Sequence, residues 1–349
     1  MTTSFFLGAN SGAGFYSLYD GFAKAAGDFS YLIKAGPGGG KSSFMRRLGK
    51  EAEKRGMDVE YILCSGDPDS LDGIYIPALR CAVIDATAPH PSEPDCFGAQ
   101  SCYVNLGVFC SPPRADESIT NLTEEYKGHY ARAYRLLAAA AQVKRRLIAA
   151  PDAPGVADTV RRRAASALSR ELGCAKRGGG DGTVCERFLH CISCRGELCL
   201  DGTISELCKR TYLLDNRFGL GFAYLDVIMR EALQRGEKII RCPDPLCPDL
   251  TEAVLMPERA LGFVCSSLCK PKEPWRHVRL DALLPAAGSR QQRGCIRRCE
   301  KLHTALLDEA VHELRQAKKH HDELEAAYRP YVDFEGLDRF TGDFIGKLF

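Results

Sequence analysis

Residues 36–43 combine side chains and backbone groups suited to binding a nucleotide phosphate. The segment reads Gly36, Pro37, Gly38, Gly39, Gly40, Lys41, Ser42 and Ser43. Glycines let the backbone wrap a phosphate with several N–H groups directed inward. In this pattern Lys41 reaches the β- and γ-phosphates, the Ser42 hydroxyl ligates Mg²⁺, and Ser43 contacts the α-phosphate. The segment therefore predicts a site for ATP and Mg²⁺.

The flanking sequence predicts the strand and helix that such a loop requires. Residues 29–35 form a short apolar run with aromatic and branched side chains, which is typical of a buried strand. After the loop, apolar residues recur at helical spacing at Phe44, Met45, Leu48 and Ala52. A helix starting here adds its positive dipole end to the loop. One position departs from the G-x-x-x-x-G-K-[ST] pattern, since Ala35 stands at its first glycine.

A second apolar run, residues 81–85, ends in Asp85 and fits the carboxylate strand of such a site. We expect Asp85 to hold Mg²⁺ through water; the alternative is a buried strand that merely ends in aspartate. Asp85 is followed by Ala86 rather than by the glutamate that activates water in many ATPases. This absence argues against fast hydrolysis.

A loop between these two segments carries three carboxylates, Asp67, Asp69 and Asp72. A carboxylate there could position Mg²⁺, activate water or accept a proton from a substrate hydroxyl, and Asp67 is the candidate catalytic base. Turn formation is the competing explanation, because Asp, Pro, Ser and Gly favour turns. His90, after the Asp85 strand, is a candidate γ-phosphate sensor or an exposed loop histidine.

The chain repeats itself at an offset near 180 residues, as when Arg55-Gly56 is matched by Arg235-Gly236. Helical patterns at 130–147 and 307–328 close the two halves. We therefore predict an α/β protein with two tandem domains, at 1–175 and 184–349. Each is expected to be a mainly parallel sheet flanked by helices, including a helical hairpin, with the ligand at the carboxyl edge of the first sheet.

The repeat also predicts that the second domain is degenerate. In the sequence alignment Lys41 matches Phe222, Ser42 matches Ala223, and Asp85 matches Cys265. The lysine, the hydroxyl and the carboxylate are lost together, so the second domain is expected to be a structural or regulatory copy.

Polar residues interrupt the helical seams of both halves. Lys144 and His321 fall at the same seam position, and we expect both to be partly exposed rather than to act as ligands.

Composition excludes several classes of protein. The 349 residues include 47 Lys and Arg against 45 Asp and Glu, with a net charge of +2 and 45% hydrophobic residues. Such balance argues against disorder and against nucleic acid or an anionic membrane as main partner. There is no run of about 20 apolar residues and no secretory leader pattern, so a cytoplasmic location is expected.

The 17 cysteines are numerous for such a chain. We expect reduced, buried thiols. The alternative is a metal or redox site at Cys191-x-x-Cys194, which lacks a second pair of the same spacing.

The segments LIKAGPGGGKSS, DPDSLDG and AVIDATAPH, in a duplicated chain of this length, resemble an uncharacterised group of bacterial tandem P-loop ATPase-like proteins of the P-loop NTPase superfamily. The resemblance covers nearly the whole chain. It implies two P-loop NTPase domains and ATP binding. It supplies no substrate, because members are described only as ATPases or nucleotide kinases. The second half departs from the group, whose members usually retain a phosphate loop there.

Two functions follow as hypotheses. The first is an ATPase or nucleotide-kinase-like enzyme, with phosphoryl transfer to water or to an unknown acceptor and a charge-stabilising arginine from Arg217 or Arg241. The second is a nucleotide-dependent binding module with slow turnover, in which ATP occupancy sets the docking of the degenerate half.

Overall fold

A computed structural model describes residues 1–89, 91–94, 96–113, 116–149, 154–173, 182–266, 273–284 and 290–349, without the side chains of 290–292. His90 lies outside the described residues, as does most of the glycine-rich stretch that joins the two halves. Within the described residues, none of the helices is long and apolar enough to cross a membrane.

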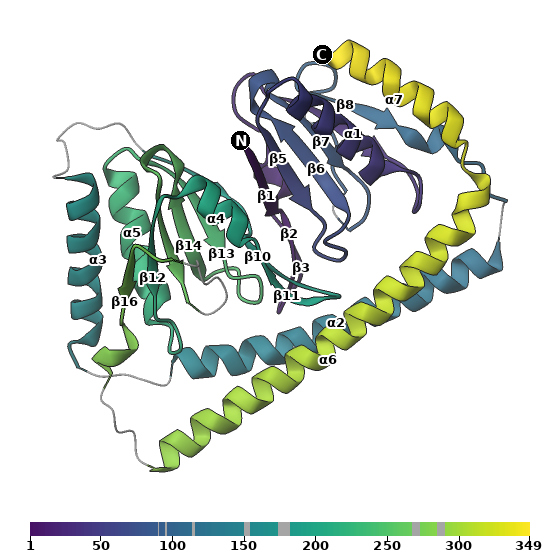
Figure 1. The fold of residues 1–349 in the computed structure, drawn as a ribbon. Helices are drawn as coiled ribbons and strands as arrows, with labels where there is room; N and C mark the ends of the chain where they lie inside the picture. Colours follow the sequence, from purple (N-terminus) through teal and green to yellow (C-terminus); the bar gives the residue numbers. More distant parts are fainter. Residues whose placement is uncertain are drawn as a thin grey trace.

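Two six-stranded mixed sheets form the framework of the chain (Figure 1). The first has the order β1-β5-β6-β7-β4-β8. Its strands are β1 (Thr2–Phe6), β5 (Val59–Leu63), β6 (Leu71–Ile76), β7 (Cys81–Asp85), β4 (Phe29–Lys34) and β8 (Ser101–Asn105). Only β6 runs antiparallel to its neighbours, and the other pairs are parallel.

The second sheet repeats this order and these directions, as β9-β13-β14-β15-β12-β16. Its strands are β9 (Thr183–Glu186), β13 (Lys238–Pro243), β14 (Thr251–Met256), β15 (Leu261–Cys265), β12 (Arg210–Leu214) and β16 (Arg276–Val278). The predicted α/β class is confirmed, and the two six-stranded sheets have the same strand order and directions.

Two short hairpins and seven helices complete the described chain. The hairpins pair β2 (Gly8–Ser11) with β3 (Gly14–Ser17), and β10 (His190–Ser193) with β11 (Gly196–Cys199). The helices are α1 (Lys41–Lys54), α2 (Glu117–Ile148), α3 (Val156–Leu172), α4 (Asp201–Leu207), α5 (Leu220–Gln234), α6 (Arg290–Tyr328) and α7 (Phe334–Leu348).

The long helices α2 and α6 lie side by side over most of their length (Figure 1). Each half contributes one of them, and the buried residues Leu137 and Leu314 belong to the core between them. At one point Glu313 receives hydrogen bonds from His129 and Arg132 across the pair. The prediction of a helical hairpin within each domain is therefore wrong, because the two long helices pair between the halves.

The halves also exchange a helix. Helix α3, from the first half, packs on α5 of the second through Val160, Ala164 and Leu168. Helix α7, from the second half, packs on the first sheet and α1 through Leu337 and Phe344. Residues 1–175 and 184–349 thus each cover a face of the other's sheet.

Phe344 is the side chain through which this exchange is best tested. Its ring lies 4.9 Å from that of Tyr31 and 5.2 Å from that of Phe44, measured between ring centroids. We expect Phe344→Ala to lower the free energy of unfolding by about 2–3 kcal/mol in urea denaturation, because a large apolar side chain leaves a packed site. The matched control is Phe334→Ala on the same helix, whose side chain is 45% exposed. Equal effects of the two changes would contradict the packing described.

A shared core joins the halves at their centre. Phe6 and Phe188 are both fully buried, and each donates its backbone N–H to the other's carbonyl, at 2.9 and 2.8 Å. The two residues hold equivalent places in the two copies, so the halves meet about an approximate two-fold axis at this bridge.

The structure corrects the register of the repeat. Helices α1 and α5 end in turns of the same kind. Met57 N–H donates to the carbonyl of Ala52 after α1, and Glu237 N–H donates to the carbonyl of Ala232 after α5. Counting back from these turns, Gly221 rather than Phe222 occupies the place of Lys41. Consequently Phe222 takes the place of Ser42, and the loop before α5 is one residue shorter.

The same shift holds at the next loop. Asp244 N–H donates to the carbonyl of Leu250, as Cys64 N–H donates to that of Ser70, so Asp244 corresponds to Cys64. The match of Lys41 with Phe222 is one residue out of register because it compares residue types, whereas the backbone hydrogen bonds identify equivalent positions.

Candidate functional site

The glycine loop, residues 35–40, connects β4 to the start of α1 at the carboxyl edge of the first sheet. Gly38 and Gly40 have φ angles of 66° and 77°, a region that side chains other than glycine rarely adopt. Gly40 is the N-cap of α1 and has no side chain to accept hydrogen bonds from the first turn. The first-turn N–H groups are therefore available to an anion.

Lys41 projects from the first turn of α1 toward the neighbouring strand. Its ammonium donates to the carbonyls of Ala35 and Gly36, at 3.2 and 3.3 Å, and lies 3.5 Å from Asp85. Asp85 is the last residue of β7, which pairs with β4 opposite Ile33. The predicted lysine and carboxylate are thus in contact.

Asp85 is 7% exposed and accepts two hydrogen bonds from Thr87, at 3.0 Å from its N–H and 2.6 Å from its hydroxyl. The Ser42 hydroxyl oxygen accepts a hydrogen bond of 3.0 Å from Leu71 N–H, whereas Ser43 is exposed. The donor set of one serine hydroxyl and one carboxylate is of the oxygen type that Mg²⁺ prefers.

Elements from the second half cover the glycine loop. A Cβ added at Gly38 would lie 3.1 Å from the carbonyl oxygen of Glu325, near the end of α6. One added at Gly40 would lie 2.5 Å from Leu337 of α7. A side chain at Gly40 would displace Leu337, and one at Gly38 would require a small shift of α6.

Asp67 lies on the loop after β5 and is 3.4 Å from the ammonium of Lys318 on α6. Lys318 also pairs with Asp322. Asp72 is instead buried and accepts a hydrogen bond of 3.0 Å from the Tyr19 hydroxyl, which identifies it as part of the core. Sequence reasoning missed Lys318, because nothing in its helical pattern distinguishes it from other surface lysines.

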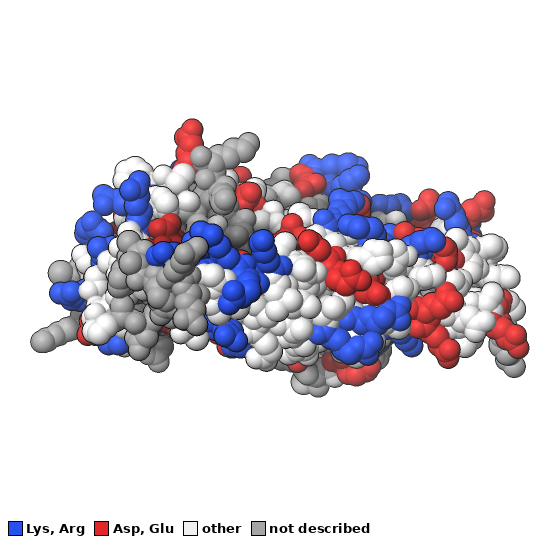
Figure 2. Space-filling view, turned by 90° about the horizontal axis from the view of Figure 1, so that it is seen from below, with Lys and Arg blue, Asp and Glu red and all other residues white. Residues whose placement is uncertain are grey.

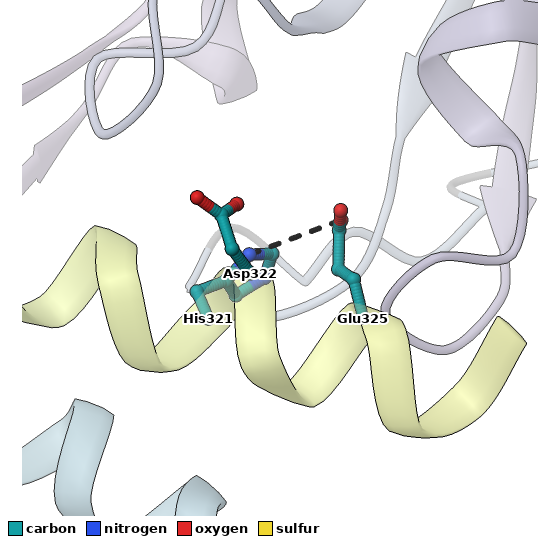
Figure 3. A group of neighbouring side chains, drawn as sticks. All are labelled: His321, Asp322 and Glu325. Atoms are coloured by element: carbon teal, nitrogen blue, oxygen red, sulfur yellow. Dashed lines mark ion pairs between the residues drawn. The ribbon is translucent and has the colours of Figure 1, made fainter.

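His321, Asp322 and Glu325 lie close together on α6 (Figure 3), and the atoms through which they could bind a metal ion are within 4.8 Å of one another. The imidazole of His321 is 3.8 Å from the carboxylate of Glu325, and the Tyr126 ring of α2 lies against it. Asp322 is held by Lys318. Each of the three side chains thus has a partner within the protein, so their proximity needs no bound metal ion to explain it.

The loop before α5 is closed by the protein's own groups. Asn216 stands where Ala35 stands in the first half, because Leu214 pairs opposite Cys265 as Ile33 pairs opposite Asp85. The side-chain amide oxygen Oδ1 of Asn216 accepts a hydrogen bond of 3.0 Å from Gly221 N–H, in the first turn of α5. A first-turn N–H that an anion would use is therefore already bonded.

Lys144 from α2 reaches this degenerate loop. Its ammonium lies 5.8 Å from the centre of the Phe222 ring and forms an ion pair with Asp244. The side chain of Lys144 is 17% exposed, which agrees with the expected partial exposure, but its ammonium pairs with the carboxylate of Asp244, which is 0% exposed. Burial lowers the pKa of Lys144, but the charge and hydrogen bond of Asp244 raise it, with a net increase.

The two arginines proposed to act across the halves have partners in the second half. Arg217 bonds Glu300 at 2.8 Å, and Arg241 pairs with Glu186 and donates to Pro248.

Most cysteines are free thiols, as expected. Cys191 and Cys194 are both free and buried, and burial raises the pKa of each thiol. Raised pKa values are typical of inert rather than reactive thiols. Cys199 is an exception, because it is disulfide-bonded.

No family model, curated protein or solved structure matches this chain. The geometry of the glycine loop and its neighbours therefore carries the functional argument alone.

Proposed function

We propose that the chain binds Mg-ATP at residues 36–43 and transfers or hydrolyses the γ-phosphate there, as a P-loop NTPase with one working site. The observation that carries this proposal is the convergence of Lys41 on Asp85 beside a glycine loop that leads directly into α1. A cation, a carboxylate and free helix N–H groups at one sheet edge are what a triphosphate with Mg²⁺ requires.

The roles follow from the contacts. Lys41 exchanges its bonds to Ala35 and Gly36 for phosphate oxygens, and the backbone of residues 36–43 cradles the phosphates. Ser42 and Asp85 hold Mg²⁺, which offsets the charge on the β- and γ-phosphates when bound. Asp67 stands on an adjacent loop as the candidate base, oriented by Lys318.

A nucleotide-dependent binding module is the second candidate, and two observations favour it. The residue after Asp85 is Ala86, so this position offers no carboxylate to activate water. The backbone carbonyl of Ala86 accepts a hydrogen bond of 2.9 Å from the ammonium of Lys34. The glycine loop also touches Glu325 and Leu337, which belong to the other half. A nucleotide bound at the loop would then change how α6 and α7 pack against the first half.

Phosphate release by wild type, Asp67→Asn and Asp69→Asn separates the two candidates. Asp69 is the matched control, because its side chain is 65% exposed and pairs with Arg195. If Asp67 is the base, Asp67→Asn lowers turnover by about 100-fold or more with little change in ATP affinity. Asp69→Asn is expected to retain wild-type turnover. Tight Mg-ATP binding with no turnover, in the presence of candidate acceptors, would reject the enzyme hypothesis and favour the nucleotide-dependent binding module.

A further inference from the structure

A cavity of about 510 Å³ lies in the second half, between α3 and the β12–β16 edge of the sheet. Figure 1 shows α3 standing against this side of the second domain. Five arginines line it: Arg162, Arg163, Arg170, Arg276 and Arg279. The cavity is distinct from the glycine loop, which belongs to the first sheet.

This cavity borders one carboxylate, Glu171, which accepts a hydrogen bond from the lining residue Tyr212 and pairs with Arg210, outside the lining. Its described lining contains no carboxylate. Among the residues that the structure describes, Arg163, Arg170, Arg276 and Arg279 form no ion pair. His277 at the rim is paired with Asp215, at 2.6 Å. The five arginines are exposed, and together they give this concave surface a positive potential that attracts anions.

The duplicated half fills the same place with aromatic rings. Phe344 of α7 packs between Tyr31 and Phe44, with ring centroids 4.9 and 5.2 Å apart, and Phe340 stacks on Phe44 at 6.1 Å. This packing leaves the first half with a closed aromatic cluster between α7, α1 and the sheet.

In the second half, the aromatic residues of the strand and of the helix that follows the loop remain, whereas the two aromatic residues of α7 have no aromatic counterpart on α3. Tyr212 and Tyr224 hold the places of Tyr31 and Phe44, by strand pairing and by helix register. The buried faces of α3 and α7 align Val160 with Leu337 and Ala164 with Thr341. The same alignment puts Arg163 at the place of Phe340 and Ala167 at that of Phe344. The cavity is therefore lined by Arg163 at the position where the first half has a phenylalanine.

We propose that this cavity binds a small molecule that carries two or more phosphate groups. Guanidinium groups bind phosphate oxygens in a bidentate manner, and the volume lies within the range of ligand pockets, about 300–1,000 Å³. On the face of α2 and α6, Figure 2 shows Lys and Arg intermixed with Asp and Glu. Concentrated positive charge in a concave pocket, on a chain of net charge +2, fits a small anion better than an extended polyanion.

Calorimetric titration with inorganic tripolyphosphate, without Mg²⁺, tests this site. The full chain is used with the change Lys41→Ala, so that the glycine loop does not compete. We expect saturable binding that weakens as salt rises. Arg163→Gln with Arg276→Gln is expected to weaken it at least tenfold, since each guanidinium supplies charge-assisted hydrogen bonds. Arg170→Gln with Arg279→Gln provides a second, independent pair.

Arg230→Gln with Arg297→Gln is the matched control, because both arginines are exposed, lie outside the cavity and remove the same charge. This pair should leave the tripolyphosphate affinity within about twofold. The absence of binding, or an equal loss in the control pair, would overturn the proposal. Tighter binding of a single-stranded RNA than of tripolyphosphate, lost in the same cavity variants, would also overturn it in favour of a nucleic-acid surface.

Discussion

Replacing Lys41 by alanine is expected to lower ATP affinity by about 10- to 100-fold and any phosphate release by at least about 100-fold. The ammonium of Lys41 contacts Asp85 and the carbonyls of Ala35 and Gly36, at the point where the glycine loop meets the sheet. Hydrogen bonds between charged partners contribute about 1.5–3 kcal/mol, and loss of a donor aimed at developing charge costs more in rate than in affinity. Titration with Mg-ATP and a phosphate-release assay measure the two effects.

Lys50→Ala is the matched control for this change. Lys50 is exposed on the same helix, so its removal changes the net charge equally but does not touch the loop. If both variants bind Mg-ATP as wild type does, the site does not lie at residues 36–43.

Replacing Lys144 by methionine is expected to lower the free energy of unfolding by about 3–5 kcal/mol. Asp244 is 0% exposed, and Lys144 is its cationic partner. Removing one partner of a buried ion pair leaves an uncompensated charge in the interior, which is the reason for the large cost. Because the pKa of Lys144 is raised in the folded chain, its stabilising contribution is complete below the unfolded-chain pKa, about 10.4, and is lost as pH rises above the folded value.

The adjacent ion pair between Arg145 and Asp249 provides the control. Its side chains are 43% and 57% exposed, so Arg145→Met should cost less than about 1 kcal/mol. Adding Asp244→Asn to Lys144→Met should recover much of the lost stability, because the uncompensated charge is then removed. Urea denaturation of the wild type and these three variants measures the differences. Equal losses for Lys144→Met and Arg145→Met would show that Lys144 is solvated.

Much of the fold followed from local sequence patterns. The apolar runs at Phe29–Lys34 and Cys81–Asp85 became neighbouring parallel strands, and the helical spacing after Lys41 became α1. These predictions succeeded because strand runs and helical periodicity depend on residues close in sequence. The contact between Lys41 and Asp85 followed as well, since parallel strands bring their carboxyl ends to one edge.

The exchange of α3 and α7 could not be predicted in the same way. An amphipathic helix has the same apolar stripe whichever sheet it covers, so Phe344 and Ala164 do not reveal their partners. Lys318 was missed, and the pairing of Lys144 with Asp244 was not predicted, for the same reason. Each lies on a long helix whose pattern is local, whereas its function in the structure depends on a loop from another part of the chain.

The two halves differ at two equivalent places, the loop before α1 or α5 and the contact of that helix with α7 or α3. In the first half Ala35 and Gly40 leave the helix N–H groups open, while in the second the Asn216 side chain bonds one of them. The second half in turn has an arginine-lined cavity where the first has packed phenylalanines. On this account duplication produced two copies of which each gained an anion site that the other lacks.

A crystal structure of the wild-type chain with Mg²⁺ and a non-hydrolysable ATP analogue tests the central claim most directly. The account predicts the β- and γ-phosphates within the loop of residues 36–43, with the Lys41 ammonium on phosphate oxygens and Mg²⁺ bound by the Ser42 hydroxyl. It predicts Asp85 in contact with Mg²⁺ through water, and no nucleotide at the loop before α5. Nucleotide bound at any place other than residues 36–43, or no nucleotide at saturating concentration, would contradict it.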